Sequence, residues 1–451
     1  MSNNNGNKGL KREMGLFSAV SVLVGCVIGS GIFTTPGKIA ASAGSIGPNM
    51  LAWVLAGVCG ILCALVYAEL APALPKAGGA YVYIDEAFGH GPSFMYGWSM
   101  FFGNFPAVIA MMATAFASNF ALLFPGLGLN DTGRRIVASA LVIGLALVNV
   151  LGVKSGSIVQ NIFTVAKVGV LVVVIVGGLF VLKPENFTTM TTQTVEWGNS
   201  FTAAVPALTA FGGYYTLSYM SGEIKNPKRN LPLATIIGMG IVIVINMLLT
   251  VACVGSVGFA NLAGSETPVS AAAQVVFGPL GTTLITAGAM ISIFGSTNGA
   301  LLGMPRVAYG MAANNMMFPF FGKLHKKYQT PHVAILIYAL VALIFVWTGN
   351  FMSLLMMGTF VSRLGEVVIC LSLIVLRKKQ PNLERPFKMW GYPISTILAA
   401  VITFILVCHV DPKQILNGSI LMLTSVPAYF IYVKLIAKKQ KVQEEETESA
   451  E

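Results

Sequence analysis

The stretch GCVIGSGIFTTPGKIA, residues 25–40, decides the fold class of this chain. It lies within the first long apolar segment, yet it holds Gly25, Gly29 and Gly31 and then Pro36. Glycine weakens a helix interior and proline interrupts it, so we expect this segment to break near its middle. Close packing of helices on a glycine-rich face would also explain a single cluster of this kind.

A second apolar segment carries a similar interruption. The sequence TAFGGYYTLSYMSGE, residues 209–223, places Gly212 and Gly213 in the middle of the sixth apolar segment. The first and sixth segments each open a set of five, so the two interruptions occupy corresponding positions of two halves. Broken helices in such positions point to a transporter whose substrate site lies at the interface of an inverted repeat.

The composition excludes a soluble enzyme. The chain has 451 residues, of which 55% are hydrophobic and only 10% charged, whereas soluble domains carry about 25% charged residues. The apolar stretches are long and unbroken, unlike membrane β-strands, which alternate over about 10 residues. Since a membrane helix needs about 20 apolar residues, we expect twelve membrane helices, over residues 16–43, 48–73, 92–123, 134–152, 157–182, 200–222, 232–257, 281–311, 332–348, 351–376, 392–410 and 415–436.

The distribution of basic residues orients these helices. Most of the 28 lysines and arginines fall in segments on the same side as the N-terminus. Only Arg134, Arg135, Lys183 and Lys413 fall in segments on the other side. Cytoplasmic segments are enriched in basic residues, so we expect both termini in the cytoplasm and the protein in the cell membrane. The net charge of +11 therefore gives no reason to expect a nucleic-acid partner.

The expected fold is an all-α polytopic membrane protein. Two inverted repeats of five helices each are followed by two further helices and flanked by polar tails. The expected ranges are 1–14 for the N-terminal tail, 15–182 and 200–376 for the repeats, 392–436 for the last two helices and 437–451 for the C-terminal tail.

The interruptions suit a zwitterionic ligand. Free N–H groups at the positive end of a half-helix favour a carboxylate, and freed carbonyl groups favour an ammonium. Gly29 and Gly31 let a ligand approach the backbone, and the Ser30 hydroxyl adds a donor. Neither glycine cluster, Gly25 to Gly31 or Gly212 and Gly213, contains an acidic side chain for a polyamine or a basic side chain for an acidic substrate. We therefore expect a neutral amino acid as the ligand.

Several longer motifs make a family resemblance specific. The motifs are VIGSGIF (27–33), YAELAPALPKAGGAYVYIDEAFG (67–89), FGGYYTLSYMSGEIKNPKRNLPLA (211–234), ISIFGSTNGALLGMPRVAYG (291–310) and LERPFK (383–388). Together they resemble the amino acid–polyamine–organocation superfamily, and within it the L-type amino acid transporter branch and its bacterial relatives. The resemblance runs from the first apolar segment to the loop after the tenth.

The resemblance implies a fold and a set of binding residues. It implies the leucine-transporter-type fold, with five helices repeated in inverted topology plus two. It also implies that Ser30 and Gly31 bind the substrate carboxylate, and that the carbonyls of Val27, Thr209 and Gly212 contact its ammonium.

The aromatic residues after the second interruption leave the shape of the side-chain pocket open. The branch usually has tryptophan where this chain has Tyr214. Phe211 is a candidate gate, although core packing explains it equally well. Tyr215 and Phe105 can crowd the same region, so we expect small to medium neutral substrates.

Lys167 is a charge about midway through the fifth apolar segment. An intramembrane lysine is expensive unless it is paired or hydrated, and from the middle of a span it does not easily reach an interface. The resemblance implies that this lysine occupies the place of sodium in sodium-coupled relatives. On that basis it would bridge the first span near Gly29 and the eighth near Ser292 or Ser296, and transport would be sodium-independent.

Arg363 and Glu366 depart from the pattern of the branch, which usually has uncharged residues at this place in the tenth span. They lie three residues apart, on one face of a helix. They form either a self-neutralising pair that faces the bundle or a gating or coupling element. Glu69, Glu223 and Arg306 lie near the cytoplasmic ends of spans, as inner-gate ion pairs or loop anchors.

The sequence indicates no catalytic set, metal site or cofactor. The predicted function is a sodium-independent exchanger of neutral L-amino acids that works by alternating access. A proton-coupled symporter of the same fold and a channel are the alternatives. Animal members of the branch pair with a glycoprotein through a cysteine after the third span, and residues 124–133 contain none, so no such partner is implied.

Overall fold

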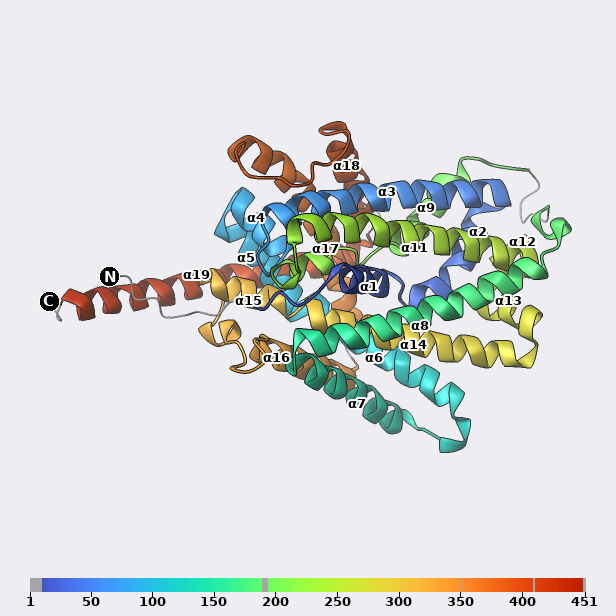
Figure 1. Cartoon of the computed structure of the whole chain (residues 1–451), viewed down its shortest axis with the longest axis horizontal. Helices are drawn as coiled ribbons and strands as arrows, with labels where there is room; N and C mark the ends of the chain where they lie inside the picture. The colour runs from blue at the N-terminus through green and yellow to red at the C-terminus, as the bar shows by residue number, and fades with distance from the viewer. Residues whose placement is uncertain (1–9, 189–193, 350, 409, 449–451) are drawn as a thin grey trace.

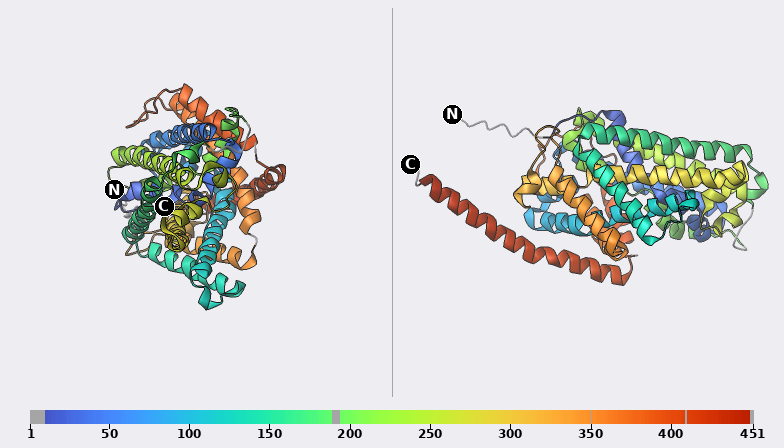
Figure 2. Two further views of the ribbon diagram at one scale, coloured as in Figure 1. Left: turned by 90° about the vertical axis from the view of Figure 1, so that its right-hand side faces the viewer. Right: turned by 90° about the horizontal axis from the view of Figure 1, so that it is seen from below.

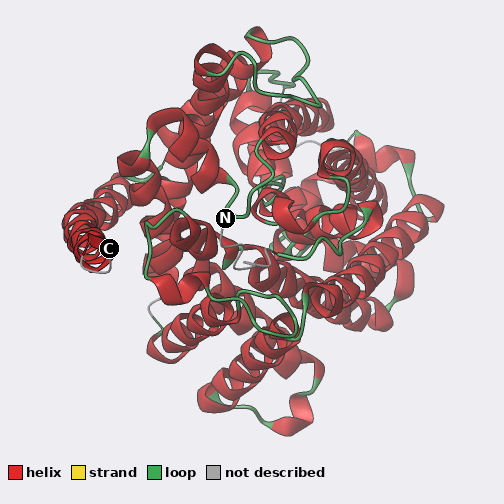
Figure 3. Ribbon diagram, turned by 60° about the vertical axis from the view of Figure 1, so that its left-hand side comes forward, coloured by secondary structure: helices red, strands yellow, loops and turns green. Residues whose placement is uncertain are grey.

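A computed structural model describes residues 10–188, 194–349, 351–408 and 410–448, without the side chains of residues 30, 209, 351–357 and 433–448. The described backbone consists of helices and loops (Figure 3). Its isolated β-bridge pairs Met14 with Ile224. The predicted all-α polytopic class is confirmed.

The helices follow one another with short connections. In chain order they are α1 (Leu16–Val27), η1 (Ser30–Phe33), α2 (Thr35–Ala43), α3 (Ile46–Ala73), α4 (Ala80–Phe88), α5 (His90–Ser99), η2 (Met100–Asn104), α6 (Phe105–Leu123), η3 (Pro125–Leu127), α7 (Asp131–Val150), α8 (Val153–Phe180), η4 (Pro184–Phe187), α9 (Asn199–Thr209), α10 (Thr216–Tyr219), η5 (Ser221–Glu223), α11 (Pro227–Val257), α12 (Phe259–Ala263), α13 (Pro268–Phe277), α14 (Pro279–Gly303), α15 (Arg306–Ala313), η6 (Pro319–Gly322), α16 (His332–Thr348), α17 (Phe351–Lys379), α18 (Ile394–Cys408) and α19 (Pro412–Glu448).

The long helices lie side by side as a bundle. Helices α3, α8, α11 and α14 run along the long axis of the molecule, and α19 extends out of the bundle on the side of the N-terminus (Figures 1 and 2). Among the described residues, eight helical stretches are long and apolar enough to cross a membrane. Four apolar helices are shorter: α1, α13, α16 and α18. The count of twelve spans and the division into two repeats stay predictions.

The backbone leaves the α-helix at both glycine clusters. Helix α1 ends at Val27, the short η1 follows, and α2 begins at Thr35. Helix α9 ends at Thr209, residues 210–215 form turns, and α10 begins at Thr216. Helix α1 packs against α8, α11 and α14, and α10 packs against α1 and α14. Both non-helical segments therefore lie inside the bundle, while their reading as two broken membrane spans stays a prediction.

Candidate functional site

The first interruption presents approachable backbone. Gly31 is exposed, and a Cβ built on it would meet Thr35 Oγ1 at 3.7 Å, an ordinary contact. A Cβ on Gly29 would meet Ser296 Oγ at 4.0 Å. Helix η1 begins at Ser30, and the first N–H groups of a helix lack partners within it. The segment can thus offer N–H groups to an anion, although the predicted hydroxyl of Ser30 lies outside the described side chains.

The second interruption touches the first. Gly213 has φ +105°, and a Cβ there would lie 2.9 Å from the carbonyl oxygen of Cys26. Only glycine fits such a backbone at such a distance. The carbonyl of Val27, a predicted ammonium contact, accepts a hydrogen bond from the N–H of Gly29 at 2.9 Å. The contact places Gly212 and Gly213 beside the end of α1; the side chain of Thr209 lies outside the description.

Lys167 connects three helices. Its side chain is 1% exposed, and its Nζ donates to the carbonyls of Gly25 at 2.8 Å and Ile28 at 2.7 Å. On α14 it donates to the carbonyl of Ser292 at 3.0 Å and to Ser296 Oγ at 3.1 Å. The ammonium on α8 therefore holds the last turn of α1 against α14. Its bonds go to Gly25 and Ile28, whereas Gly29 accepts from Ser292 Oγ at 3.3 Å.

A buried polar ladder continues from Lys167 along α8. Thr164 Oγ1 donates to the carbonyl of Ser21 at 2.9 Å, and Gln160 Nε2 donates to Thr164 Oγ1 at 3.3 Å. Asn298 Nδ2 then donates to Gln160 Oε1 at 2.9 Å. The sequence-based expectations did not include this ladder. Gln160 and Thr164 lie four residues apart in an otherwise apolar segment, and this spacing, which places them on one face of a helix, could have indicated it.

The aromatic residues of the second interruption are packed into the core. Phe211 is 1% exposed and meets the ring of Trp53 edge to face at 6.0 Å. Tyr214 is 6% exposed and packs in the same manner on Tyr67 at 5.6 Å. Phe105, expected to crowd the site, packs on Tyr219 at 5.7 Å. In this conformation Phe211 is a packed side chain, and its role as a gate stays a prediction.

The charged pair Arg363 and Glu366 on α17 contacts the second interruption through Tyr214. Arg363 Nη1 lies 3.3 Å from Glu366 Oε2, and Tyr214 donates to Glu366 Oε1 at 3.4 Å. The side chain of Arg363 is 21% exposed and that of Glu366 is 7% exposed. Since Lys167 donates to α1 and α14, the two charged groups make separate sets of contacts.

Two ion pairs with fully buried carboxylates lie at the end of the bundle that carries Met14. Arg306 and Glu223, both fully buried, make two hydrogen bonds of 2.9 Å, Nε to Oε2 and Nη2 to Oε1. The N–H of Met14 donates to the carbonyl of Glu223 at 3.1 Å, and the N–H of Lys225 donates to the carbonyl of Met14 at 2.8 Å. Arg377 holds Glu69 through Nε–Oε1 and Nη2–Oε2 contacts of 2.8 and 2.6 Å. Glu69 also accepts from the N–H of Met389 at 2.6 Å, so it anchors the loop after α17.

Comparison with known proteins assigns this architecture to a family of transporters. The sequence profile described as "Amino acid permease" matches residues 14–433. The serine/threonine exchanger of Bacillus subtilis (strain 168) is 32% identical over 403 residues, which cover 88% of this chain and 91% of the relative. The human b(0,+)-type amino acid transporter 1 is 30% identical, with 94% and 88% covered. The small subunit 2 of the mouse large neutral amino acids transporter is 31% identical, with 96% and 83% covered. The chain therefore belongs to the amino acid permease family, whose members are multi-pass membrane transporters and not enzymes.

Proposed function

We propose that this protein carries neutral L-amino acids across the cell membrane by sodium-independent exchange and alternating access. The observation that carries the proposal is the contact between the two interruptions, where Gly213 meets the end of α1. Gly213, in the second non-helical segment, lies against the backbone of Cys26 and Val27, the last two residues of α1 before the first non-helical segment. The carboxylate would bind at Ser30 and Gly31, and the ammonium at the carbonyls of Val27, Thr209 and Gly212.

Sodium independence is supported by the surroundings of Lys167. Its ammonium has four oxygen atoms within 3.1 Å, from α1 and α14. A cation bound among the same oxygens would meet a positive charge already in place. Lys167 therefore supplies the charge and the links between helices that a bound sodium ion would otherwise supply.

The substrate class is supported by the relatives and by the side chains near the site. Relatives are named as an exchanger of serine and threonine and as a transporter of large neutral amino acids. Tyr214, packed against Tyr67, narrows the space beside the second interruption. We propose alanine, serine and cysteine as preferred substrates.

The distribution of basic residues supports an orientation of the protein in the membrane. We place both termini in the cytoplasm, so the end that holds the Arg306–Glu223 pair faces inward. The protein needs a lipid bilayer and an amino acid, and we propose that it works without a disulfide-linked glycoprotein subunit.

Uptake into proteoliposomes tests the substrate class. Vesicles that contain the purified protein and an unlabelled amino acid are given each labelled amino acid in turn, with and without sodium. We expect saturable uptake of small neutral amino acids, unchanged by sodium, and no uptake of their methyl esters. Transport of the methyl esters would contradict recognition of the carboxylate. Leucine or tryptophan binding at least about tenfold more tightly than alanine, a difference of about 1.4 kcal/mol, would contradict the small pocket.

A further inference from the structure

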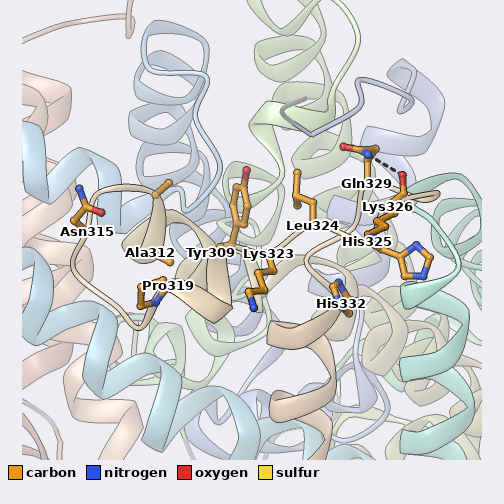
Figure 4. A pocket seen from close by; sticks show the side chains of 12 residues that line it. Tyr309, Ala312, Asn315, Pro319, Lys323, Leu324, His325, Lys326, Gln329 and His332 are labelled. Atoms are coloured by element: carbon orange, nitrogen blue, oxygen red, sulfur yellow. Dashed lines mark hydrogen bonds between the residues drawn. The ribbon is translucent and has the colours of Figure 1, made fainter. Parts of the chain in front are cut away.

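A basic cavity lies apart from the proposed amino acid site. It has a volume of about 1070 Å³ and is bounded by α15, by η6 and by the loop that leads into α16. Its polar lining includes Lys323, Lys326, His325, His332 and Gln329. Figure 4 shows Lys323 and His332 pointing to the same side of the loop. None of the twelve described residues that line the cavity is acidic.

The chemistry of this lining suits a phosphate group. Lys323 and Lys326 are exposed and make no ion pair among the described side chains. Helix α16 begins at His332, a lining residue, so the positive end of this helix lies at the cavity. Nδ1 of His332 is buried and has no partner among the described groups. Two exposed ammonium groups beside the positive end of a helix, in a lining without acidic residues, favour a compact anion.

An aromatic pair beside the cavity indicates where such an anion comes from. Phe318 and Phe320 flank the lining residue Pro319, are 42% and 39% exposed, and stack with their ring centres 5.5 Å apart. In segments that lie at a membrane surface, phenylalanine side chains enter the boundary between the lipid headgroups and the acyl chains. Basic pockets between membrane helices bind anionic headgroups there. A soluble anion would need the lysines but would gain nothing from the two rings.

We propose that this cavity binds the phosphate of an anionic phospholipid, with Lys323 and Lys326 on the phosphate and Phe318 and Phe320 beside the acyl chains. Helix α15 links the cavity to the buried ion pair, because it carries Arg306 at its first residue and Tyr309 in the cavity lining. A bound lipid would thus hold the element that closes this end of the bundle. The test reads lipid binding alone, so its outcome is independent of the proposed transport function.

Native mass spectrometry of the full-length protein in detergent measures the proposed binding. The protein is titrated with phosphatidylglycerol or phosphatidylcholine, and the dissociation constant of the first bound lipid is determined. We expect phosphatidylglycerol to bind more tightly than phosphatidylcholine. In the double variant Lys323→Gln/Lys326→Gln we expect phosphatidylglycerol to bind about 30-fold more weakly, since each lysine near an anionic lipid surface strengthens binding by about fivefold and the two factors multiply.

Two controls separate the site from general surface charge and from soluble anions. Lys378→Gln/Lys388→Gln removes the same charge from exposed positions at the same end of the bundle and should bind as the wild type does. Phe318→Ser/Phe320→Ser should weaken the binding of phosphatidylglycerol, and excess inorganic phosphate should not displace the lipid. Equal binding of the two lipids, equal weakening by the control pair, or displacement by inorganic phosphate would each overturn the proposal.

Discussion

At the scale of single residues, replacing Lys167 tests the proposed mechanism most directly. Lys167→Ala removes an ammonium that donates to three carbonyls and one hydroxyl. The hydroxyls of Ser292 and Ser296 already lie within 3.3 Å of those carbonyls, so they can take over most of the bonds. One carbonyl is left unpaired, at about 1–3 kcal/mol. We therefore expect Lys167→Ala to fold, with a purified yield like that of the wild type, but to exchange amino acids much more slowly in proteoliposomes.

The controls for this variant lie on the same helix. Lys154→Ala removes an exposed lysine near the start of α8 and should exchange normally. Lys167→Arg should not restore exchange, since a planar guanidinium fits poorly among acceptors gathered around a single point. Wild-type exchange by Lys167→Ala, or sodium-stimulated transport by the unmodified protein, would show that the lysine does not replace a sodium ion.

The two interruption glycines should respond differently to the same substitution. Gly31→Ala adds a methyl group whose nearest neighbour, Thr35 Oγ1, is at an ordinary contact distance of 3.7 Å, so the protein should fold, while the methyl group obstructs the carboxylate. Loss of one charge-assisted hydrogen bond, about 1.5–3 kcal/mol, weakens binding by about 10- to 100-fold. Gly213→Ala forces a side chain onto φ +105° and against Cys26, with strain of about 1–3 kcal/mol. Thermal unfolding with and without the ligand alanine distinguishes the two variants: Gly31→Ala should unfold as the wild type does but gain little stability from alanine, whereas Gly213→Ala should unfold at a lower temperature even without it. Normal stabilisation of Gly31→Ala by alanine would contradict the carboxylate site.

The pair on α17 can be assigned a role by neutralising it in steps. Glu366→Gln keeps an acceptor for Tyr214 but leaves Arg363 without its partner. If the pair only neutralises itself, Arg363→Gln/Glu366→Gln should restore exchange, because coupled residues show their interaction in such a cycle. We expect instead that exchange stays low in the double variant, since Glu366 contacts the tyrosine of the second interruption. Restored exchange in the double variant would make the pair structural.

At the scale of elements, the ion pair between η5 and α15 should dominate the stability of the end that carries the N-terminus. Arg306→Met leaves the fully buried Glu223 unpaired, and breaking such a pair lowers the free energy of unfolding by about 3–5 kcal/mol. The double variant Arg306→Met/Glu223→Leu should recover most of this loss in thermal unfolding. Lys228→Met, which breaks an exposed pair with Glu384, should lower stability by at most about 1 kcal/mol. A similar loss in both single variants would contradict the buried pair as the main link.

Some features of these helices could be predicted from the sequence, and others depend on how the helices pack. The glycine clusters located both departures from the α-helix, because the conformational preference of glycine is local. Lys167, a charge midway through an apolar segment, marked its own importance for a similar reason. Its partners could not be predicted in the same manner: the two carbonyls of α1 that it binds depend on how α1, α8 and α14 pack. The ladder through Thr164 and Gln160, and the contact of Tyr214 with Glu366, likewise depend on helix rotations that periodicity leaves open.

At the scale of the whole molecule, the mode of transport separates the proposed exchanger from its alternatives. The Arg306–Glu223 pair and the backbone pairing of Met14 with Ile224 join α15, η5 and the segment before α1. For an exchanger, we infer that these contacts reopen only with substrate bound. We therefore expect labelled alanine to enter vesicles preloaded with alanine and not empty vesicles, with saturation and without effect of a pH gradient. Uptake into empty vesicles driven by an inward proton gradient would instead identify a symporter. Unsaturable flux into empty vesicles without any gradient of protons would identify a channel.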